Sequence, residues 1–136
     1  MIRTIIHDID ILKIKSLPAT QEDTAVADDL LDTLRANAET CVGMAANMIG
    51  VHKAIIVFNN QGEMMEMFNP VIKSSSGSYE TEEGCLSLDG QRKTKRYQYI
   101  KVRYQDRSFI WHIKRFSGWE AQIIQHEIDH CNVVFI

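Results

Sequence analysis

The feature that most constrains this chain is the segment His126-Glu-Ile-Asp-His130. Side chains four residues apart lie on the same face of an α-helix, so both imidazoles can reach one metal ion if the segment is helical. Ser117, followed three residues later by Glu120, is typical of a capping box and predicts a helix that runs from there to about Cys131. Glu127 lies beside the histidines and can act as general base toward a water molecule. The alternative interpretation is an amphipathic helix with two surface histidines.

A third metal ligand is expected upstream, because only six residues follow His130. Hydrolytic metal sites usually have three protein ligands and one open position. Cys85 is a candidate because Gly84 lets the backbone bend tightly beside it. The two preceding carboxylates would raise the pKa of an isolated thiol, which argues against a free nucleophile but is tolerable when a cation holds the thiolate.

The residue types alone leave the choice of third ligand open. His112 is expected to face solvent or lie at a sheet edge, and His7 and His52 lack a ligand-like context. Cys41 and Cys131 are flanked by small or apolar residues, so both are expected to be buried thiols.

Composition narrows the class of protein. A chain of 136 residues, with 45% hydrophobic and 24% charged residues, predicts one domain over residues 1–136 with a substantial core. The formal net charge of −3 argues against a nucleic-acid binder, including a specific DNA binder. No apolar run approaches the roughly 20 residues needed to cross a bilayer, and early charges argue against a signal peptide. Three cysteines fit a reducing compartment, so a cytoplasmic location without a membrane partner is expected.

The order of predicted elements favours an α+β fold over a βαβ array. A helix is expected over 20–38, with Thr20 and Asp23 placed for a capping box. Its apolar face repeats every four residues, at Val26, Leu30 and Leu34. Strands are expected over 53–58 and 64–68 around a turn at 59–62, and over 100–104 and 109–113 around a turn at 106–108.

Three further segments receive a structural interpretation. The run Ser74–Ser78 predicts a surface loop, and the five methionines at positions 44, 48, 64, 65 and 67 are expected to fill the core. The basic run 91–96 predicts a solvated loop, with contact to an acidic partner such as ribosomal RNA as the alternative. The hairpin strand 109–113 is expected to turn Phe109, Trp111 and Ile113 toward the core.

Three motifs in order resemble those of the peptide deformylase family: Val42-Gly-Met-Ala-Ala46, Glu83-Gly-Cys-Leu-Ser87 and Gln125-His-Glu-Ile-Asp-His130. Asn69-Pro70 and Arg92 also fit the family pattern, and the similarity spans about residues 20–136. The resemblance implies a fold of mixed or antiparallel β-sheets packed around a central helix that bears the two histidines.

The resemblance also implies the chemistry. Such enzymes remove the N-formyl group from the N-terminal methionine of newly synthesised polypeptides and release formate. Cys85, His126 and His130 would be the metal ligands, Glu127 the general acid/base, and the Leu86 backbone N–H would face the developing oxyanion. Ferrous iron is the expected cofactor, with zinc, nickel or cobalt as alternatives. The expected partners are N-formylmethionyl peptides of nascent chains and, transiently, the ribosome.

The resemblance further implies a pocket for the methionine side chain, formed by Val42, Gly43, Trp119 and Ile123. Met48 occupies the position where the family has a glutamine that donates a hydrogen bond to the oxyanion. A thioether cannot donate, and losing one such donor costs about 10²–10³ in kcat.

Other departures accompany Met48. Cys41 replaces a glycine, and Asn47 is expected to point away from Met48 on an extended segment, so it is not expected to replace the lost donor. Three hypotheses follow: a deformylase with reduced or shifted activity, a catalytically weak or inactive metal-binding protein with a binding or regulatory role, and a metalloamidase or peptidase acting on another acyl group.

Overall fold

The computed structural model describes residues 1–85 and 88–132 of the chain. It combines α-helices with one antiparallel sheet in the strand order β1-β2-β3-β4-β5, which confirms the predicted α+β class. The helices and strands of the described residues are α1 (Ile9–Leu12), α2 (Thr24–Ala36), β1 (Gly43–Ala45), β2 (Ile55–Asn60), β3 (Glu63–Cys85), β4 (Leu88–Gln105), β5 (Trp111–Ser117) and α3 (Gly118–Cys131). Two 3₁₀ helices, η1 (Gln21–Asp23) and η2 (Ala46–Ile49), complete them. No helix among the described residues is long and apolar enough to cross a membrane.

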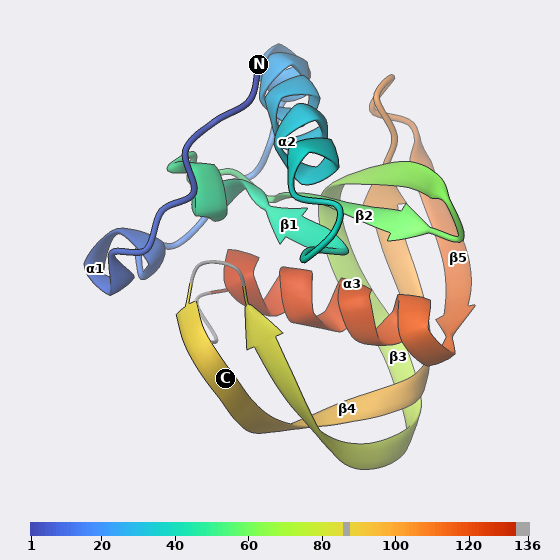
Figure 1. Cartoon of the computed structure of the whole chain (residues 1–136). Coiled ribbons are helices and arrows are strands. Elements are labelled where there is room, and N and C mark those ends of the chain that lie inside the picture. Colours follow the sequence, from blue (N-terminus) through green and yellow to red (C-terminus); the bar gives the residue numbers. More distant parts are fainter. Residues whose placement is uncertain (86–87, 133–136) are drawn as a thin grey trace.

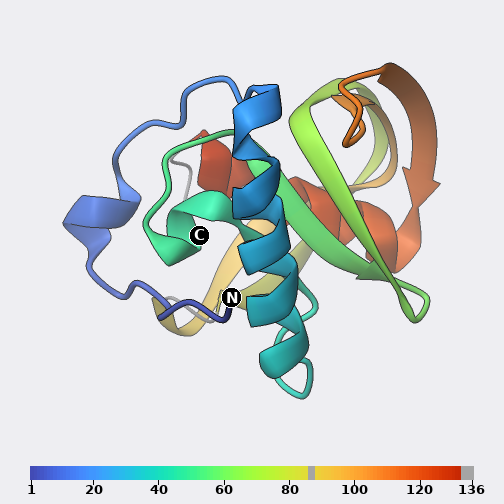
Figure 2. The ribbon, with the colours of Figure 1, turned by 90° about the horizontal axis from the view of Figure 1, so that it is seen from above.

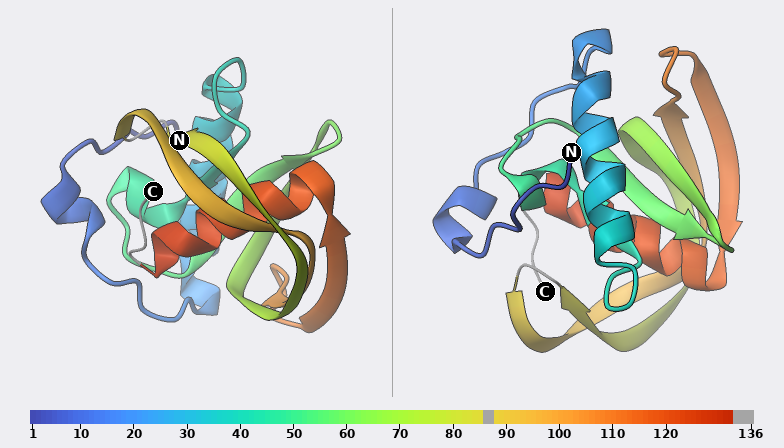
Figure 3. Two further views of the ribbon diagram at one scale, coloured as in Figure 1. Left: turned by 90° about the horizontal axis from the view of Figure 1, so that it is seen from below. Right: turned by 45° about the horizontal axis from the view of Figure 1, so that its top comes forward.

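Helix α3 lies in the middle of the molecule, and the bent sheet wraps around it (Figure 1). The ends of β3 and β4 pass beneath α3, whereas β1 and β2 lie above it (Figure 3). The apolar face of α3 packs into one core cluster with the sheet, and this cluster includes Ile124, Ile128, Ile56, Phe58 and Val102. The helix that carries both histidines is therefore held on several sides.

Helix α2 covers the other face of β1 and β2 (Figure 2). Its residues Leu30 and Leu34 pack against Ile55 and Val57 in a second cluster, while Ile56 and Phe58 belong to the α3 cluster. Successive strand residues point to opposite faces, so β2 is buried on both sides between the two helices. This explains the continuous apolar run at 55–58, and it fixes β1 and η2 close to α3.

Two predicted loops are strands. Ser74–Ser78 lies inside β3, and the basic run 91–96 lies inside β4, where both pair across one long hairpin. The hairpin supplies main-chain hydrogen-bond partners to both segments, which local composition does not reveal. Gly77 has a φ of 72°, a backbone conformation that favours glycine, between the paired residues Ser76 and Ser78.

The hairpin of β4 and β5 is confirmed, but two of the three residues predicted to face the core, Trp111 and Ile113, do not. Trp111 and Ile113 are 43% and 56% exposed, and both lie on β5, the edge strand of the sheet. Trp111 instead packs on the guanidinium of Arg103, 3.6 Å from the ring centroid. Phe109 precedes β5 with a φ of 60° and packs against Phe68 in the α2 cluster.

The two predicted capping boxes have different outcomes. The Thr20 backbone N–H donates to the Asp23 carboxylate at 2.8 Å, as predicted, and 3₁₀ and α-helix follow over 21–36. Ser117 is the N-cap of α3, but its side chain makes no capping hydrogen bond. Glu120 instead accepts a hydrogen bond from Gln61 at 3.0 Å, so the predicted box at this end is wrong although the helix is present.

Candidate metal centre

Helix α3 presents His126 and His130 on one face, with ring centroids 5.1 Å apart. His130 is 2% exposed, and the His126 side chain is also largely buried. Residues four apart on a helix lie on one face, so the one-turn spacing of the sequence becomes a side-by-side placement of two imidazoles.

Cys85 reaches the same place from the end of β3. Its Sγ lies 3.2 Å from His130 Nε2, and one ligand atom from each of Cys85, His126 and His130 lies within 4.8 Å of the others. One sulfur and two imidazole nitrogens are a donor set that suits zinc and other borderline-soft divalent ions, and three protein ligands leave a position open. The residues present therefore fit a divalent cation. Of the cysteines and histidines considered from the sequence, these three are brought together.

The other candidates are not part of this three-residue cluster. His112 contacts Asp106 on edge strand β5, with Nε2 2.7 Å from a carboxylate oxygen. Cys131 is buried in the α3 cluster, and burial raises its pKa to about 12. Cys41 is half-buried and lines a cavity beside the three-residue cluster. Its thiol donates to the Gly43 carbonyl at 2.9 Å. Burial raises the pKa of Cys41 to about 12, so the thiol stays protonated.

Glu127 is 4% exposed and lies beside the histidine pair. Its Oε1 has no hydrogen-bond partner among the described residues. Burial raises the pKa of Glu127 to about 7. A buried carboxyl group whose pKa lies near neutrality can both accept and return a proton, which is the property required of a general acid/base.

Gly43 makes room for Glu127. A Cβ at this position would lie 2.7 Å from Ile123 Cγ2 and 2.9 Å from Glu127 Oε2. Both distances are shorter than side chains tolerate, so strand β1 can approach α3 this closely only with glycine at position 43.

Glu83 orients His126. Its Oε1 lies 2.9 Å from His126 Nδ1, which leaves Nε2 as the nitrogen available to a cation. Burial alone would raise the pKa of Glu83, but hydrogen bonds from His126 and Arg96 outweigh it and lower the pKa to about 2. Glu83 is therefore ionised, and an ionised partner fixes the imidazole orientation firmly.

Arg96 completes a buried ionic network that the sequence did not reveal. Its guanidinium donates to both oxygens of Glu83, with Nη2 to Oε1 at 2.7 Å and Nε to Oε2 at 2.9 Å, and its Nη1 donates to Asp129 at 2.7 Å. Arg96 is 4% exposed, although it belongs to the basic run predicted to be solvated. The pairing joins residues from β3, β4 and α3, so only the hairpin register could have predicted it.

The two imidazoles differ in protonation. Burial would lower the pKa of His126, but the nearby Glu127, Cys85 and Glu83 groups outweigh this and raise it to about 10. The pKa of His130 is lowered to about 3 by burial and by the positive charges of His126 and Arg96. A metal-bound imidazole is neutral, so a cation held by His126 would displace the proton that these neighbouring groups favour on its ring.

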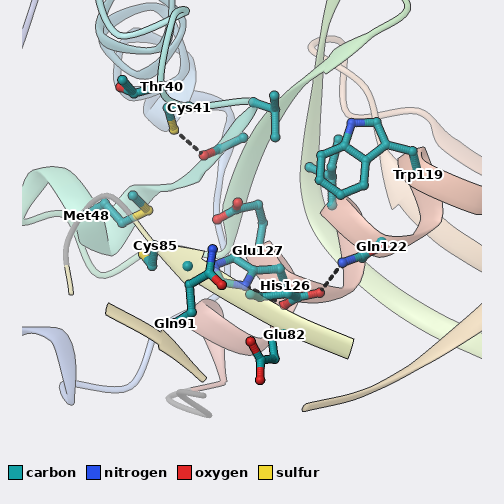
Figure 4. Close-up of a pocket in the computed structure, with 15 residues that line it drawn as sticks. Thr40, Cys41, Met48, Glu82, Cys85, Gln91, Trp119, Gln122, His126 and Glu127 are labelled. Carbon is teal, nitrogen blue, oxygen red and sulfur yellow. Dashed lines mark hydrogen bonds and ion pairs between the residues drawn. The ribbon is translucent and has the colours of Figure 1, made fainter. Parts of the chain in front are cut away.

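A cavity of about 250 Å³ opens beside these groups (Figure 4). All five residues expected near the substrate line it: Val42, Gly43, Met48, Trp119 and Ile123. The figure shows Met48 and Cys85 on one side and Trp119 on the opposite side, with the Glu127 carboxylate between them. The sequence did not point to Thr40, Gln91 and Gln122, which also line the cavity.

Met48 and Asn47 lie on η2, so the predicted extended segment at this position is wrong. The Met48 thioether faces the cavity and accepts from the Ala45 backbone N–H at 3.5 Å. The Asn47 amide donates to the carbonyls of Leu12 and His130, at 3.3 and 3.0 Å, so its N–H groups are engaged with the main chain. Asn47 does not supply the donor that Met48 lacks. Leu86, whose backbone N–H was expected to face the oxyanion, lies outside the described residues.

Comparisons with known proteins agree on one family. The family model of polypeptide deformylases matches residues 2–136. A peptide deformylase of Clostridium beijerinckii is 55% identical over 136 residues, covering 100% of both chains, and one of Caldanaerobacter subterraneus subsp. tengcongensis is 33% identical over 93% of this chain and 81% of its own. Among solved structures, the Thermotoga maritima peptide deformylase superposes with a TM-score of 0.90 at 26% identity, covering 99% of this chain and 95% of its own. The Met-Ala-Ser-bound class I type b peptide deformylase of Acinetobacter baumannii gives the same TM-score and identity, covering 99% and 97%.

Proposed function

The chain belongs to the polypeptide deformylase family, and on this premise we propose that it hydrolyses the N-formyl group of N-formylmethionyl peptides and releases formate. The observation that carries the proposal is the convergence of Cys85, His126 and His130 within 4.8 Å, beside the buried Glu127 and a cavity of about 250 Å³. A nucleophile-generating site next to a substrate-sized cavity is what amide hydrolysis requires.

Cys85, His126 and His130 would hold one divalent cation. Such a cation, when bound, would supply Lewis-acid chemistry, namely polarisation of a carbonyl oxygen and a lowered pKa of bound water. Fe²⁺ is the ion that the family resemblance favours, while the sulfur and imidazole donors would also accept Zn²⁺, Ni²⁺ or Co²⁺. Glu83 and Arg96 would keep the first histidine in the required tautomer.

Glu127 would move the protons of the reaction. Its free Oε1 takes a proton from the attacking water, and the protonated carboxyl then delivers that proton to the nitrogen of the leaving amine. The pKa of about 7 suits both steps at neutral pH. The backbone N–H of Leu86 is proposed as an oxyanion donor.

The cavity would take the methionine side chain of the substrate. Ile123 and Val42 supply apolar surface, and Gly43 adds no side chain to the cavity wall. Trp119 is 58% exposed at the cavity, so its indole is available to cover a bound peptide. An unbranched thioether would fit such an apolar wall well.

A second candidate function rests on Met48. Since Met48 faces the cavity and has no donor, the same fold could serve as a catalytically weak metal-binding protein with a binding or regulatory role. A direct measure separates the two functions: formate release from a formyl-Met peptide by protein purified without oxygen, with the bound metal quantified. Rapid release supports the deformylase, and a fully metal-loaded protein without release supports the alternative.

Two further comparisons sharpen this experiment. Acetylated and free-amine peptides are assayed beside the formylated one, and turnover of either in preference to formyl-Met would favour a different metalloamidase. Met48→Gln restores a donor and is expected to raise kcat about tenfold or more. An unchanged kcat in this variant would show that Met48 does not limit turnover.

A further inference from the structure

A chain of polar contacts leads away from the metal centre through residues that the proposed reaction does not use. Gln122 Nε2 donates to Glu83 Oε2 at 2.9 Å, and Tyr79 Oη donates to Gln122 Oε1 at 3.2 Å. Gln122 lies on α3 one turn before His126, and Tyr79 lies on β3 four residues before Glu83. The same helix and strand that carry the histidine and its carboxylate partner thus carry this second pair.

Both carboxylate oxygens of Glu83 contact polar groups of neighbouring residues. Oε1 accepts from Arg96 and contacts His126 Nδ1, while Oε2 accepts from Arg96 and from Gln122. Arg96 alone holds the carboxylate along one edge. Gln122 adds a contact to the second oxygen, so it restricts rotation of the carboxylate about the bond that sets the position of Oε1.

Tyr79 selects the orientation of the Gln122 amide. Because Tyr79 donates to Oε1, the Nε2 group is turned toward Glu83. The opposite orientation would place the amide oxygen against a carboxylate oxygen. Burial and the charge of Glu83 raise the pKa of Tyr79, so the hydroxyl remains a donor over the working range of pH.

We propose that Gln122 and Tyr79 are positioning residues that hold the Glu83 carboxylate, and through it the ring of His126, in the geometry that a divalent cation requires. This inference rests on the proposed function, since it takes His126 as a ligand. Partners behind a ligand usually affect metal affinity about 10- to 100-fold. Gln122 lies one step further out, so its loss is expected to weaken binding about tenfold.

Two variants separate positioning from other roles. Gln122→Met removes the amide at nearly constant length, but Gln122 also lines the cavity. Tyr79→Phe removes only the hydroxyl, and Tyr79 is not among the residues that line the cavity. A matched control is Gln61→Met, because Gln61 also donates to a glutamate, Glu120, but this contact is exposed and involves neither Glu83 nor a proposed metal ligand.

The experiment measures Zn²⁺ affinity by competition with a chelating dye, and the visible absorption spectrum of the Co²⁺-loaded protein. We expect Kd for Zn²⁺ to rise about tenfold in Gln122→Met and about threefold in Tyr79→Phe, with a shifted Co²⁺ spectrum in both. Gln61→Met is expected to match the unsubstituted protein. Circular dichroism of each variant is the control for correct folding.

The possible results differ in what they overturn. Unchanged Kd and spectrum in Tyr79→Phe and Gln122→Met, with normal binding by the unsubstituted protein, would overturn the positioning role and leave the proposed function intact. Absence of Zn²⁺ and Co²⁺ binding by the unsubstituted protein would overturn both. A change in peptide KM for Gln122→Met without any change in metal affinity would assign Gln122 to the cavity wall alone and contradict the inference.

Discussion

At the scale of single residues, the candidate centre depends on one carboxyl group with an altered pKa. Glu127 is buried beside two histidines, and burial rather than a neighbouring anion is the main cause of its raised pKa. The proposed role of Glu127 is proton transfer and not metal coordination. Substitution of its carboxylate should therefore affect the rate of hydrolysis without affecting metal binding.

Glu127→Gln is expected to lower kcat for formate release by at least 10²-fold, because the amide cannot accept and return a proton. Zn²⁺ should still bind, since Cys85, His126 and His130 are unchanged. Formate assays and Zn²⁺ titration of the same preparation provide the test. Retention of more than a tenth of the activity would exclude Glu127 as the general base.

Gly43→Ala tests the close approach of β1 to α3. The added Cβ would meet Ile123 and Glu127 at 2.7 and 2.9 Å, so either β1 or the Glu127 side chain must move. We expect a loss of about 1–3 kcal/mol in the free energy of unfolding together with reduced kcat. Gly62→Ala is a control for the loss of a glycine, since nothing lies within 4 Å of its added Cβ, although its φ of 93° adds some strain of its own. Urea denaturation of both variants measures their free energies of unfolding. If Gly43→Ala were as stable as the unsubstituted protein, the predicted clash of the added Cβ with Ile123 and Glu127 would be contradicted.

At the scale of elements, the buried network of Arg96 joins β3, β4 and α3. Arg96→Leu would leave the buried Glu83 and the partly buried Asp129 without their cation. The free energy of unfolding should fall by about 3–5 kcal/mol. Arg107→Leu, which removes an exposed arginine paired with Glu66 and Asp28, should cost about 1 kcal/mol or less. A similar loss of unfolding free energy in both variants would show that the buried network contributes no more to stability than the exposed ion pairs do.

The elements differ in how far sequence could predict them. Helix α3 was predicted from the four-residue spacing of its histidines and from a capping box that does not form, and β2 was predicted from its continuous apolar run. The serines of β3 and the basic residues of β4 carry no such local signal, because their pairing partner is another part of the chain. The position of Arg96 was missed for this reason, and so were the contacts of Tyr79 and Gln122 with Glu83.

At the scale of the whole molecule, stability should depend on pH through Glu127. Its carboxyl has a pKa of about 7 in the folded chain and an ordinary value of 4.5 when unfolded. The folded protein therefore binds more protons between these values, and this group makes the protein less stable as pH rises from about 4.5 to 7. In chelator-treated protein, Glu127→Gln should become progressively more stable than the unsubstituted protein across this range. Urea denaturation at several pH values tests this, and a constant difference would contradict it.

The distribution of the proposed metal ligands along the chain has a consequence for biosynthesis. Cys85 ends β3, whereas both histidines belong to α3, the last helix of the described residues, and the thiol lies against an imidazole 45 positions later. Translation is vectorial, so a nascent chain carries an unshielded thiol until position 130 has emerged. If these three residues hold a cation, the complete donor set exists only after both segments have been synthesised, so metal acquisition would be a late step of maturation.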